Sequence, residues 1–142
     1  MKITLPLTVI AFETDFGGVV SNTRYIEYIE RGRYALVHAA GLKLTEVWAT
    51  HGVQPVVRRN EVDYLVPAYH EDELELTVEV AAHSGATTTL RYQLLRPRDG
   101  AVIMRAVQTL AYLNTKWKPV RVPPIFREAL AENHRDTEAQ RA

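Results

Sequence analysis

The stretch ETDFGGVVSNTRYIEYIERGR, residues 13–33, decides the fold of this chain. From Asn22 onward its apolar side chains recur at spacings of three and four residues, which is the pattern of one face of an α-helix. Asn22 is a favourable residue for the N-cap of a helix, and Gly41 is a favourable residue just beyond its C-terminus. The spacing therefore predicts one long helix bounded by Asn22 and Gly41.

Gly32 lies inside this predicted helix, where a glycine costs about 1 kcal/mol relative to alanine. A residue without a side chain also allows another element to approach the helix closely. We therefore expect the helix to pack against a sheet at Gly32.

The residues outside the helix follow a period of two, which predicts β-strands. A first strand around Leu5–Ala11 precedes the helix, and four more are expected at 62–66, 74–82, 90–94 and 101–114. The turns His83-Ser84-Gly85 and Arg98-Asp99-Gly100 suit antiparallel hairpins, because glycine tolerates positive φ. The order of strand, long helix and four strands predicts an α+β fold in which the helix covers one face of an antiparallel sheet.

The remaining segments predict minor elements around a single domain. Residues 44–49 are expected to form a short helical turn that ends at His51-Gly52. The proline pair Pro123-Pro124 starts a short helix, and polar residues follow it. We therefore assign residues 1–122 to the main domain and residues 123–142 to a short C-terminal helix and a flexible tail.

The composition excludes several classes of partner and site. The 17 lysine and arginine residues balance 17 aspartate and glutamate residues, so the net charge gives no reason to expect a nucleic acid as partner. The sequence has no cysteine, which excludes disulfides and thiolate chemistry. It has no run of about 18 apolar residues that would span a membrane. We therefore expect a soluble, cytoplasmic protein without a membrane span.

Three common catalytic arrangements are absent from the sequence. Ser21 and Ser84 are the only serines, and neither lies in the G-x-S-x-G turn of an α/β-hydrolase. The five histidines show neither H-x-H nor H-x-x-x-H spacing, so we expect no metal site. Gly17-Gly18 lacks the lysine that follows in a phosphate-binding loop. The carboxylates are therefore the main candidates for catalysis.

Asp15 lies between the first strand and the helix, where two hypotheses apply. As a nucleophile or general base, it would lie beside the free N–H groups of the helix start, which favour negative charge and stabilise an oxyanion. Gly17 and Gly18 would let the backbone approach another group closely there. Alternatively, Asp15 forms an Asx-turn, as loop aspartates often do. Spacing alone favours the turn, and both hypotheses stay open at this point.

Two blocks of residues bear on this choice. The first is D-F-G-G-V-V-S-N-T-R-Y at 15–25, followed by E-R-G-R at 30–33. The second is V-D-Y-L-V-P-A at 62–68, which leads to D-E-L at 72–74. Together the blocks resemble the hotdog-fold acyl-CoA thioesterases of the 4-hydroxybenzoyl-CoA thioesterase (YbgC-like) family, and the resemblance covers residues 3–115.

The resemblance implies a five-stranded antiparallel sheet wrapped around one long central helix. It also implies a homodimer or homotetramer with each active site at a subunit interface. Asp15 matches the family's catalytic aspartate, which acts as nucleophile or general base. Gly18 matches the glycine of the turn, and Asn22 matches the position whose backbone N–H polarises the thioester carbonyl. The implied reaction hydrolyses an acyl-CoA thioester to a carboxylic acid and coenzyme A, without a further cofactor.

Several other residues have less specific roles in this scheme. Tyr25 fits both a pocket-lining role and the buried stripe of the helix, while Glu13 and Thr14 are expected to support the turn at Asp15. Coenzyme A is polyanionic, and basic residues bind phosphates. The first candidates for these contacts are Arg58, Arg59 and Lys116, and the wider set adds Arg96, Arg98, Lys118 and Arg121.

Val19 and Ser21-Asn22 depart from the family pattern, because histidine or aromatic residues are common at these positions. The acyl group, aromatic or aliphatic, therefore does not follow from the resemblance. Acyl carrier protein is the alternative to coenzyme A as the carrier. The alternative function is a non-catalytic hotdog protein that binds acyl groups without hydrolysing them.

Overall fold

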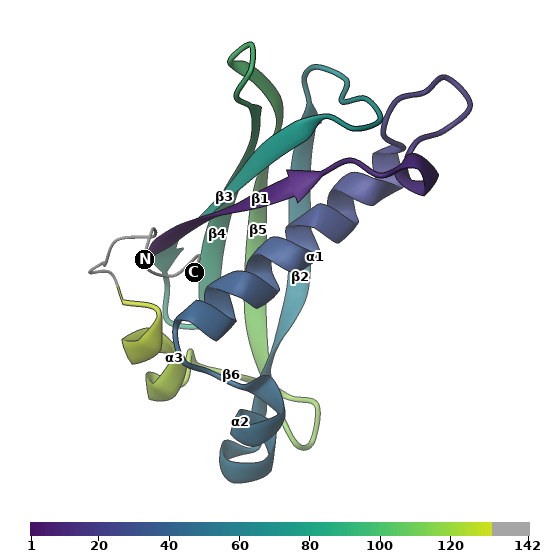
Figure 1. Ribbon diagram of the computed structural model, residues 1–142. Coiled ribbons are helices and arrows are strands. Elements are labelled where there is room, and N and C mark those ends of the chain that lie inside the picture. Colours follow the sequence, from purple (N-terminus) through teal and green to yellow (C-terminus); the bar gives the residue numbers. More distant parts are fainter. Residues whose placement is uncertain (132–142) are drawn as a thin grey trace.

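One long helix lies across the inner face of an antiparallel sheet (Figure 1). This computed structural model describes residues 1–131. The strands are β1 Lys2–Thr8, β2 Val53–Tyr64, β3 Glu73–His83, β4 Thr87–Arg96, β5 Ala101–Asn114 and β6 Pro119–Val120. The helices are α1 Asn22–Ala39, α2 Leu44–His51 and α3 Pro124–Ala129, and a 3-10 turn, η1, covers Ala11–Glu13.

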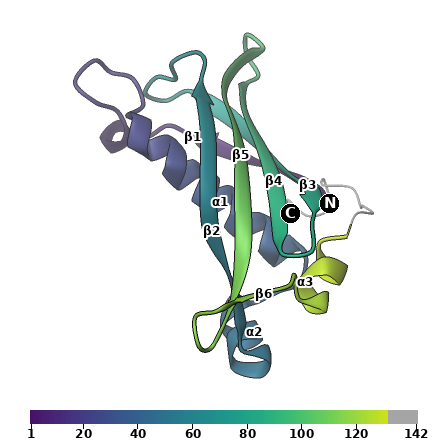
Figure 2. The ribbon, with the colours of Figure 1, turned by 180° about the vertical axis from the view of Figure 1, so that it is seen from behind.

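The main strands follow the order β1-β3-β4-β5-β2, and β6 pairs with the end of β5 (Figure 2). All neighbouring pairs are antiparallel. The β3-β4 and β4-β5 connections are hairpins whose turns fall at the two predicted positions. The strands that flank the helices in sequence, β1 and β2, lie at opposite edges of the sheet. This arrangement confirms the predicted α+β class and is the hotdog fold.

The ends of α1 follow from local backbone geometry. Ser21 is the N-cap, with φ −68° and ψ 144°, and Asn22 is the first helical residue, so the predicted N-cap is wrong by one position. At the other end Gly41 adopts a φ of 85°. The N–H groups of Gly41 and Leu42 donate to carbonyls of the last turn at 2.9 and 3.1 Å. This Schellman motif requires the left-handed conformation that Gly41 supplies, as predicted.

Gly32 marks a close approach between α1 and β3. A Cβ atom built on Gly32 would lie 2.8 Å from Leu76 Cδ2 and 2.8 Å from Val78 Cγ2. Real Cβ atoms do not approach other carbons so closely, and both neighbours are fully buried. The expected packing of the helix against a sheet at Gly32 is confirmed.

The core lies between α1 and the inner face of the sheet. Ile29 and Leu36 of α1 are completely buried there. Alternate residues of the three central strands are buried as well: Leu74, Leu76, Val78, Leu90, Tyr92, Leu94, Met104, Ala106, Leu110 and Tyr112. Burial of one large apolar side chain contributes about 1.5–3 kcal/mol, so this layer holds α1 firmly against the sheet.

The structure corrects two strand boundaries. β2 begins at Val53 rather than at position 62, because the segment from Val53 pairs with the end of β5 although it does not alternate. Pro55 lies in this segment, which is tolerable in an edge strand. β1 ends at Thr8 rather than continuing to Ala11, where η1 begins.

The C-terminal helix α3 begins at Pro124, as the proline pair predicts. Its Phe126 is buried and packs against Tyr112, with ring centroids 5.0 Å apart. The predicted flexible tail lies outside the described residues from position 132 onward. None of the helices within residues 1–131 is long and apolar enough to cross a membrane.

Candidate active site

The segment between η1 and α1 is a tight turn closed by backbone hydrogen bonds. The Asp15 N–H donates to the Val19 carbonyl at 2.8 Å, and the Gly18 N–H donates to the Asp15 carbonyl at 3.0 Å. Gly18 has a φ of 80°, in the left-handed region that favours glycine. The turn therefore depends on Gly18, the glycine that the sequence pattern singled out.

The Asp15 side chain is exposed and takes part in this turn. Its Oδ1 accepts a hydrogen bond from the Gly17 N–H at 2.8 Å, which is an Asx-turn. No other residue of the described chain donates a hydrogen bond to the second oxygen, Oδ2. The turn-forming hypothesis is therefore correct, and it leaves one carboxylate oxygen open to a substrate or a water molecule.

Glu13 and Thr14 hold the turn from the η1 side, as expected. Glu13 is buried, and its Oε1 accepts hydrogen bonds from the Tyr28 hydroxyl at 2.8 Å and from the Ile10 N–H at 3.1 Å. Burial and the Glu13 hydrogen bond raise the pKa of Tyr28 well above its ordinary value, so the phenol stays protonated and donates. The Thr14 hydroxyl donates to the Ala11 carbonyl at 2.7 Å. Glu13 thus ties the turn to the second turn of α1, at Tyr28.

The other side of the turn is bound to the segment between β2 and β3. The Val20 N–H donates to the Ala68 carbonyl at 2.9 Å, and Val19 forms an isolated antiparallel bridge with Tyr69. Ala68 is fully buried. The turn that carries Asp15 is therefore held between α1 and the segment at 65–72.

The start of α1 follows the turn directly. The first N–H groups of an α-helix have no intrahelical partner, and they lie at the positive end of the helix dipole. Asn22 and Thr23 are both exposed, and the N-cap Ser21 makes no side-chain hydrogen bond to the helix. The helix start therefore offers N–H donors to a ligand beside the turn.

Two tyrosines border the helix start. Tyr25 is buried and packs edge-to-face against Tyr64, with ring centroids 5.4 Å apart. Burial raises the pKa of the Tyr25 hydroxyl. Tyr64 is half exposed, and its hydroxyl lies 3.5 Å from the Asn22 carbonyl. Tyr25 thus packs in the core, while Tyr64 forms the surface next to the helix start.

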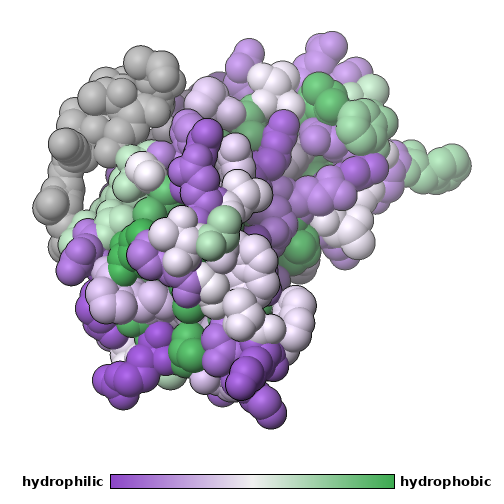
Figure 3. All heavy atoms as spheres, turned by 90° about the horizontal axis from the view of Figure 1, so that it is seen from below, coloured by the Kyte–Doolittle hydropathy of each residue, from purple (hydrophilic) through white to green (hydrophobic). Residues whose placement is uncertain are grey.

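Apolar side chains are exposed on and near the turn. Phe16 at its tip is completely exposed, and Phe12 of η1 is largely exposed. Figure 3 shows a hydrophobic projection at its right margin, and the turn lies on the same side in Figure 1. The rest of the face in Figure 3 mixes hydrophilic and hydrophobic groups. The tip of the turn is thus an uncovered apolar surface in a single chain.

One of the three basic residues proposed for coenzyme A, Lys116, lies away from Asp15 within one chain. Arg58 and Arg59 are exposed on β2, and Lys116 is exposed in the turn after β5. Lys116 lies beyond the first residue of β2, whereas the start of α1 lies beside the last one, Tyr64. A strand of this length spans roughly 35–40 Å. The structure therefore does not bring Lys116 together with Asp15 in one chain.

Two hollows of about 260 Å³ each lie along the C-terminal half of α1. Tyr34 and His38 line both hollows, one of which is completed by β1 and the other by the start of α2. Asp15 lines neither hollow.

Within residues 1–131, no group of three or more histidine, aspartate or glutamate side chains is placed to hold a metal ion.

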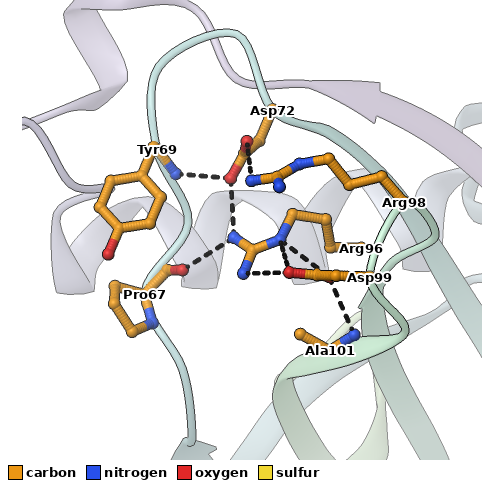
Figure 4. A network of polar contacts seen from close by, with 7 residues as sticks. All are labelled: Pro67, Tyr69, Asp72, Arg96, Arg98, Asp99 and Ala101. Carbon is orange, nitrogen blue, oxygen red and sulfur yellow. Dashed lines mark hydrogen bonds and ion pairs between the residues drawn. The ribbon is translucent and has the colours of Figure 1, made fainter.

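Sequence reasoning missed a buried ionic network beside the segment at 65–72 (Figure 4). Arg96 is only 5% exposed, and its Nη1 lies 2.8 Å from Asp72 Oδ2. Arg96 is therefore not a free surface cation, and its inclusion among the phosphate-binding candidates is wrong. The available signal was weak, because Asp72 and Arg96 meet only through the register of β3 with β4.

Comparisons with known proteins relate the chain to thioesterases. The sequence matches the family described as the thioesterase-like superfamily over residues 10–130. It is 29% identical over 127 residues to acyl-CoA thioesterase YbgC of Haemophilus influenzae, which covers 89% of this chain and 92% of that protein. It is 25% identical over 133 residues to a chloroplastic acyl-acyl carrier protein thioesterase of Arabidopsis thaliana, which covers 94% of this chain and 70% of that protein.

The fold has close counterparts among solved structures. The crystal structure of a 1,4-dihydroxy-2-naphthoyl-CoA thioesterase from Synechocystis superimposes with a TM-score of 0.84 at 16% identity. The match covers 92% of this chain and 96% of that one. A likeness at this identity concerns the fold, and it confirms the predicted architecture.

Proposed function

The chain belongs to the thioesterase-like superfamily, and on this premise we propose that it hydrolyses acyl-CoA thioesters to the free acid and coenzyme A. The observation that carries the proposal is the setting of Asp15. Its exposed carboxylate lies in a turn held from both sides, directly before the start of α1. Gly17 engages one carboxylate oxygen, and the second remains for chemistry.

In the proposed reaction, the thioester carbonyl oxygen accepts a hydrogen bond from the N–H at Asn22. The negative charge that develops on this oxygen is stabilised by the N–H and by the helix dipole. As a general base, Asp15 removes a proton from a water molecule whose oxygen attacks the carbonyl carbon. As a nucleophile, its carboxylate attacks the same carbon, and water then hydrolyses the resulting anhydride. In both cases the C–S bond breaks, and the sulfur leaves and is protonated to the thiol.

We further propose that a second copy of the chain completes the active site, in a homodimer or a homotetramer. Ligand sites are concave and mostly apolar, whereas Asp15 and Phe16 lie on an open surface of one chain. A neighbouring copy that covers the turn would enclose the acyl group. Lys116, which is remote from Asp15 in one chain, and the exposed Arg58 and Arg59 of β2 would then contact the phosphates of a coenzyme A bound at the neighbouring copy's active site.

Steady-state hydrolysis of a panel of thioesters tests the proposed activity. The panel contains aromatic, short-chain and long-chain acyl-CoA substrates, and the released thiol is measured. The same acyl groups on acyl carrier protein distinguish the two carriers. We expect turnover of at least one class, and the absence of thiol release with every substrate would refute the proposal.

One observation favours the alternative of a non-catalytic acyl-binding protein. Because Asp15 accepts the Gly17 N–H in an Asx-turn, it has a structural reason to occupy its position without any chemistry. Calorimetry separates the two functions. Tight binding of an acyl-CoA without release of a thiol would support the alternative, whereas turnover by the same sample would exclude it.

A further inference from the structure

We propose that Arg96 and Asp72 act as positioning residues that set the place of the Asp15 turn through the segment to which that turn is bound. The inference rests on the proposed function, because it matters for catalysis only if Asp15 is reactive. The first link is the hydrogen bond from the Val20 N–H to the Ala68 carbonyl, at 2.9 Å. The position of the turn therefore depends on the position of the peptide at Ala68.

The Asp72–Arg96 pair holds the chain on both sides of Ala68 (Figure 4). On one side, Arg96 Nη1 donates to the Pro67 carbonyl at 3.1 Å. On the other, the Tyr69 N–H donates to Asp72 Oδ2 at 2.9 Å. The same Oδ2 lies 2.8 Å from Arg96 Nη1. One ion pair thus fixes both neighbours of the residue that binds the turn.

Arg96 is itself held by the β4-β5 hairpin. Its Nε lies 3.1 Å from Asp99 Oδ1, and its Nη2 lies 3.0 Å from Asp99 Oδ2. Asp99 in turn accepts the Ala101 N–H at 3.1 Å, at the start of β5. The planar guanidinium therefore joins two carboxylates and one carbonyl in a fixed geometry, which the single ammonium of lysine does not reproduce.

The segment at 65–72 contains no helix and no strand apart from the bridge at Tyr69. Backbone hydrogen bonds hold its two ends, from the Leu65 N–H to the Ile103 carbonyl at 2.9 Å and from the Glu71 N–H to the Val9 carbonyl at 2.8 Å. The ion pair therefore acts on the middle of the segment, on both sides of Ala68.

Arg96 is 5% exposed and Asp72 is 8% exposed, so water does not weaken their contact strongly. Burial acts to raise the pKa of Asp72, but the Tyr69 N–H and the two arginines, Arg96 and Arg98, outweigh it and lower the pKa below its ordinary value. The pair therefore stays ionised at neutral pH.

Backbone amide exchange, measured residue by residue by NMR, tests the positioning role without reference to activity. Arg96→Lys is compared with Arg91→Lys, the same change at an exposed position of β4. We expect the Val20 and Tyr69 amides to exchange about tenfold faster in Arg96→Lys, since charged hydrogen bonds that order the segment are lost. Amides of the β3 core, such as that of Leu76, are expected to keep their rates, and Arg91→Lys is expected to change none of them. An unchanged rate at Val20, or an equal rise at Leu76, would overturn the proposal.

A kinetic comparison links this role to Asp15. Arg96→Lys is expected to lower kcat about tenfold with little change in KM, and to have no further effect in an Asp15→Asn background. Equal effects in both backgrounds would contradict the link. If Arg96→Lys does not fold, Asp72→Asn replaces it in both experiments with the same expectations. If the wild-type protein releases no thiol, the proposed function fails, yet the exchange rates still decide the positioning role.

Discussion

Gly32→Ala is expected to destabilise the protein by roughly 1–2 kcal/mol, although alanine is the better helix former. The intrinsic preference favours alanine by about 1 kcal/mol. Against this, the new Cβ would lie 2.8 Å from atoms of both Leu76 and Val78 and 3.3 Å from Tyr92. All three neighbours are buried in the core between α1 and the sheet, so none has free space into which to move. Overpacking of this kind costs about 1–3 kcal/mol, and two simultaneous contacts place the cost in the upper part of that range.

Urea denaturation measures the free energy of unfolding of Gly32→Ala and of a second variant for comparison. Ala35→Gly, the reverse change in the same helix, measures the helix preference together with the contacts of one half-buried methyl group, and it is expected to cost about 1–2 kcal/mol. Because α1 packs closely against β3 at Gly32, we expect Gly32→Ala to unfold at a lower midpoint concentration of urea with an unchanged m-value. A higher midpoint for Gly32→Ala would mean that the helix preference dominates, and it would refute the close packing at Gly32.

Two further outcomes depend on polar groups that are buried or half-buried. Tyr28→Phe removes a hydrogen bond to the buried carboxylate of Glu13. We expect the free energy of unfolding, measured by urea titration, to fall by about 1–3 kcal/mol. An unfolding free energy equal to that of the wild type would contradict this role of Glu13. Burial, reinforced by the charge of Arg127, lowers the pKa of His83. Below pH 6.5 the unfolded chain therefore binds more protons than the native chain, so the free energy of unfolding falls as the pH falls. His83→Gln should lose less stability than the wild type between pH 7 and pH 5, and superimposable pH curves would disprove the effect.

The parts of the fold that the sequence predicts are those set by local periodicity and by glycine. Gly41 ends α1 because the left-handed conformation there is local, and Gly32 signals a close approach even though its partner strand is unknown. β3 is recognisable because its outward side chains remain polar. The start of β2 at Val53 is not recognisable, because pairing with β5 creates that strand without any alternation.

In the candidate site too, residues that are contiguous in sequence are predictable, whereas residues that only strand pairing brings together are not. Asp15, Gly18 and the helix start are contiguous in sequence, so the turn they form is visible in a short motif. Arg96 and Asp72 are 24 residues apart and meet only when β3 and β4 pair in the correct register. A sequence read position by position therefore presents Arg96 as one more surface cation, whereas the fold buries it beside its partners.

Asp15→Asn tests the central proposal most directly. The amide oxygen of asparagine can accept the Gly17 N–H as Asp15 Oδ1 does, so the turn is kept while the negative charge is removed. Asp63→Asn, the same change at an exposed position of β2, serves as the control. With the best thioester of the panel, kcat/KM is expected to fall by about 10²–10⁴ in Asp15→Asn and to stay at the wild-type value in Asp63→Asn. A wild-type kcat/KM in Asp15→Asn would contradict the assignment of Asp15 as the reactive carboxylate.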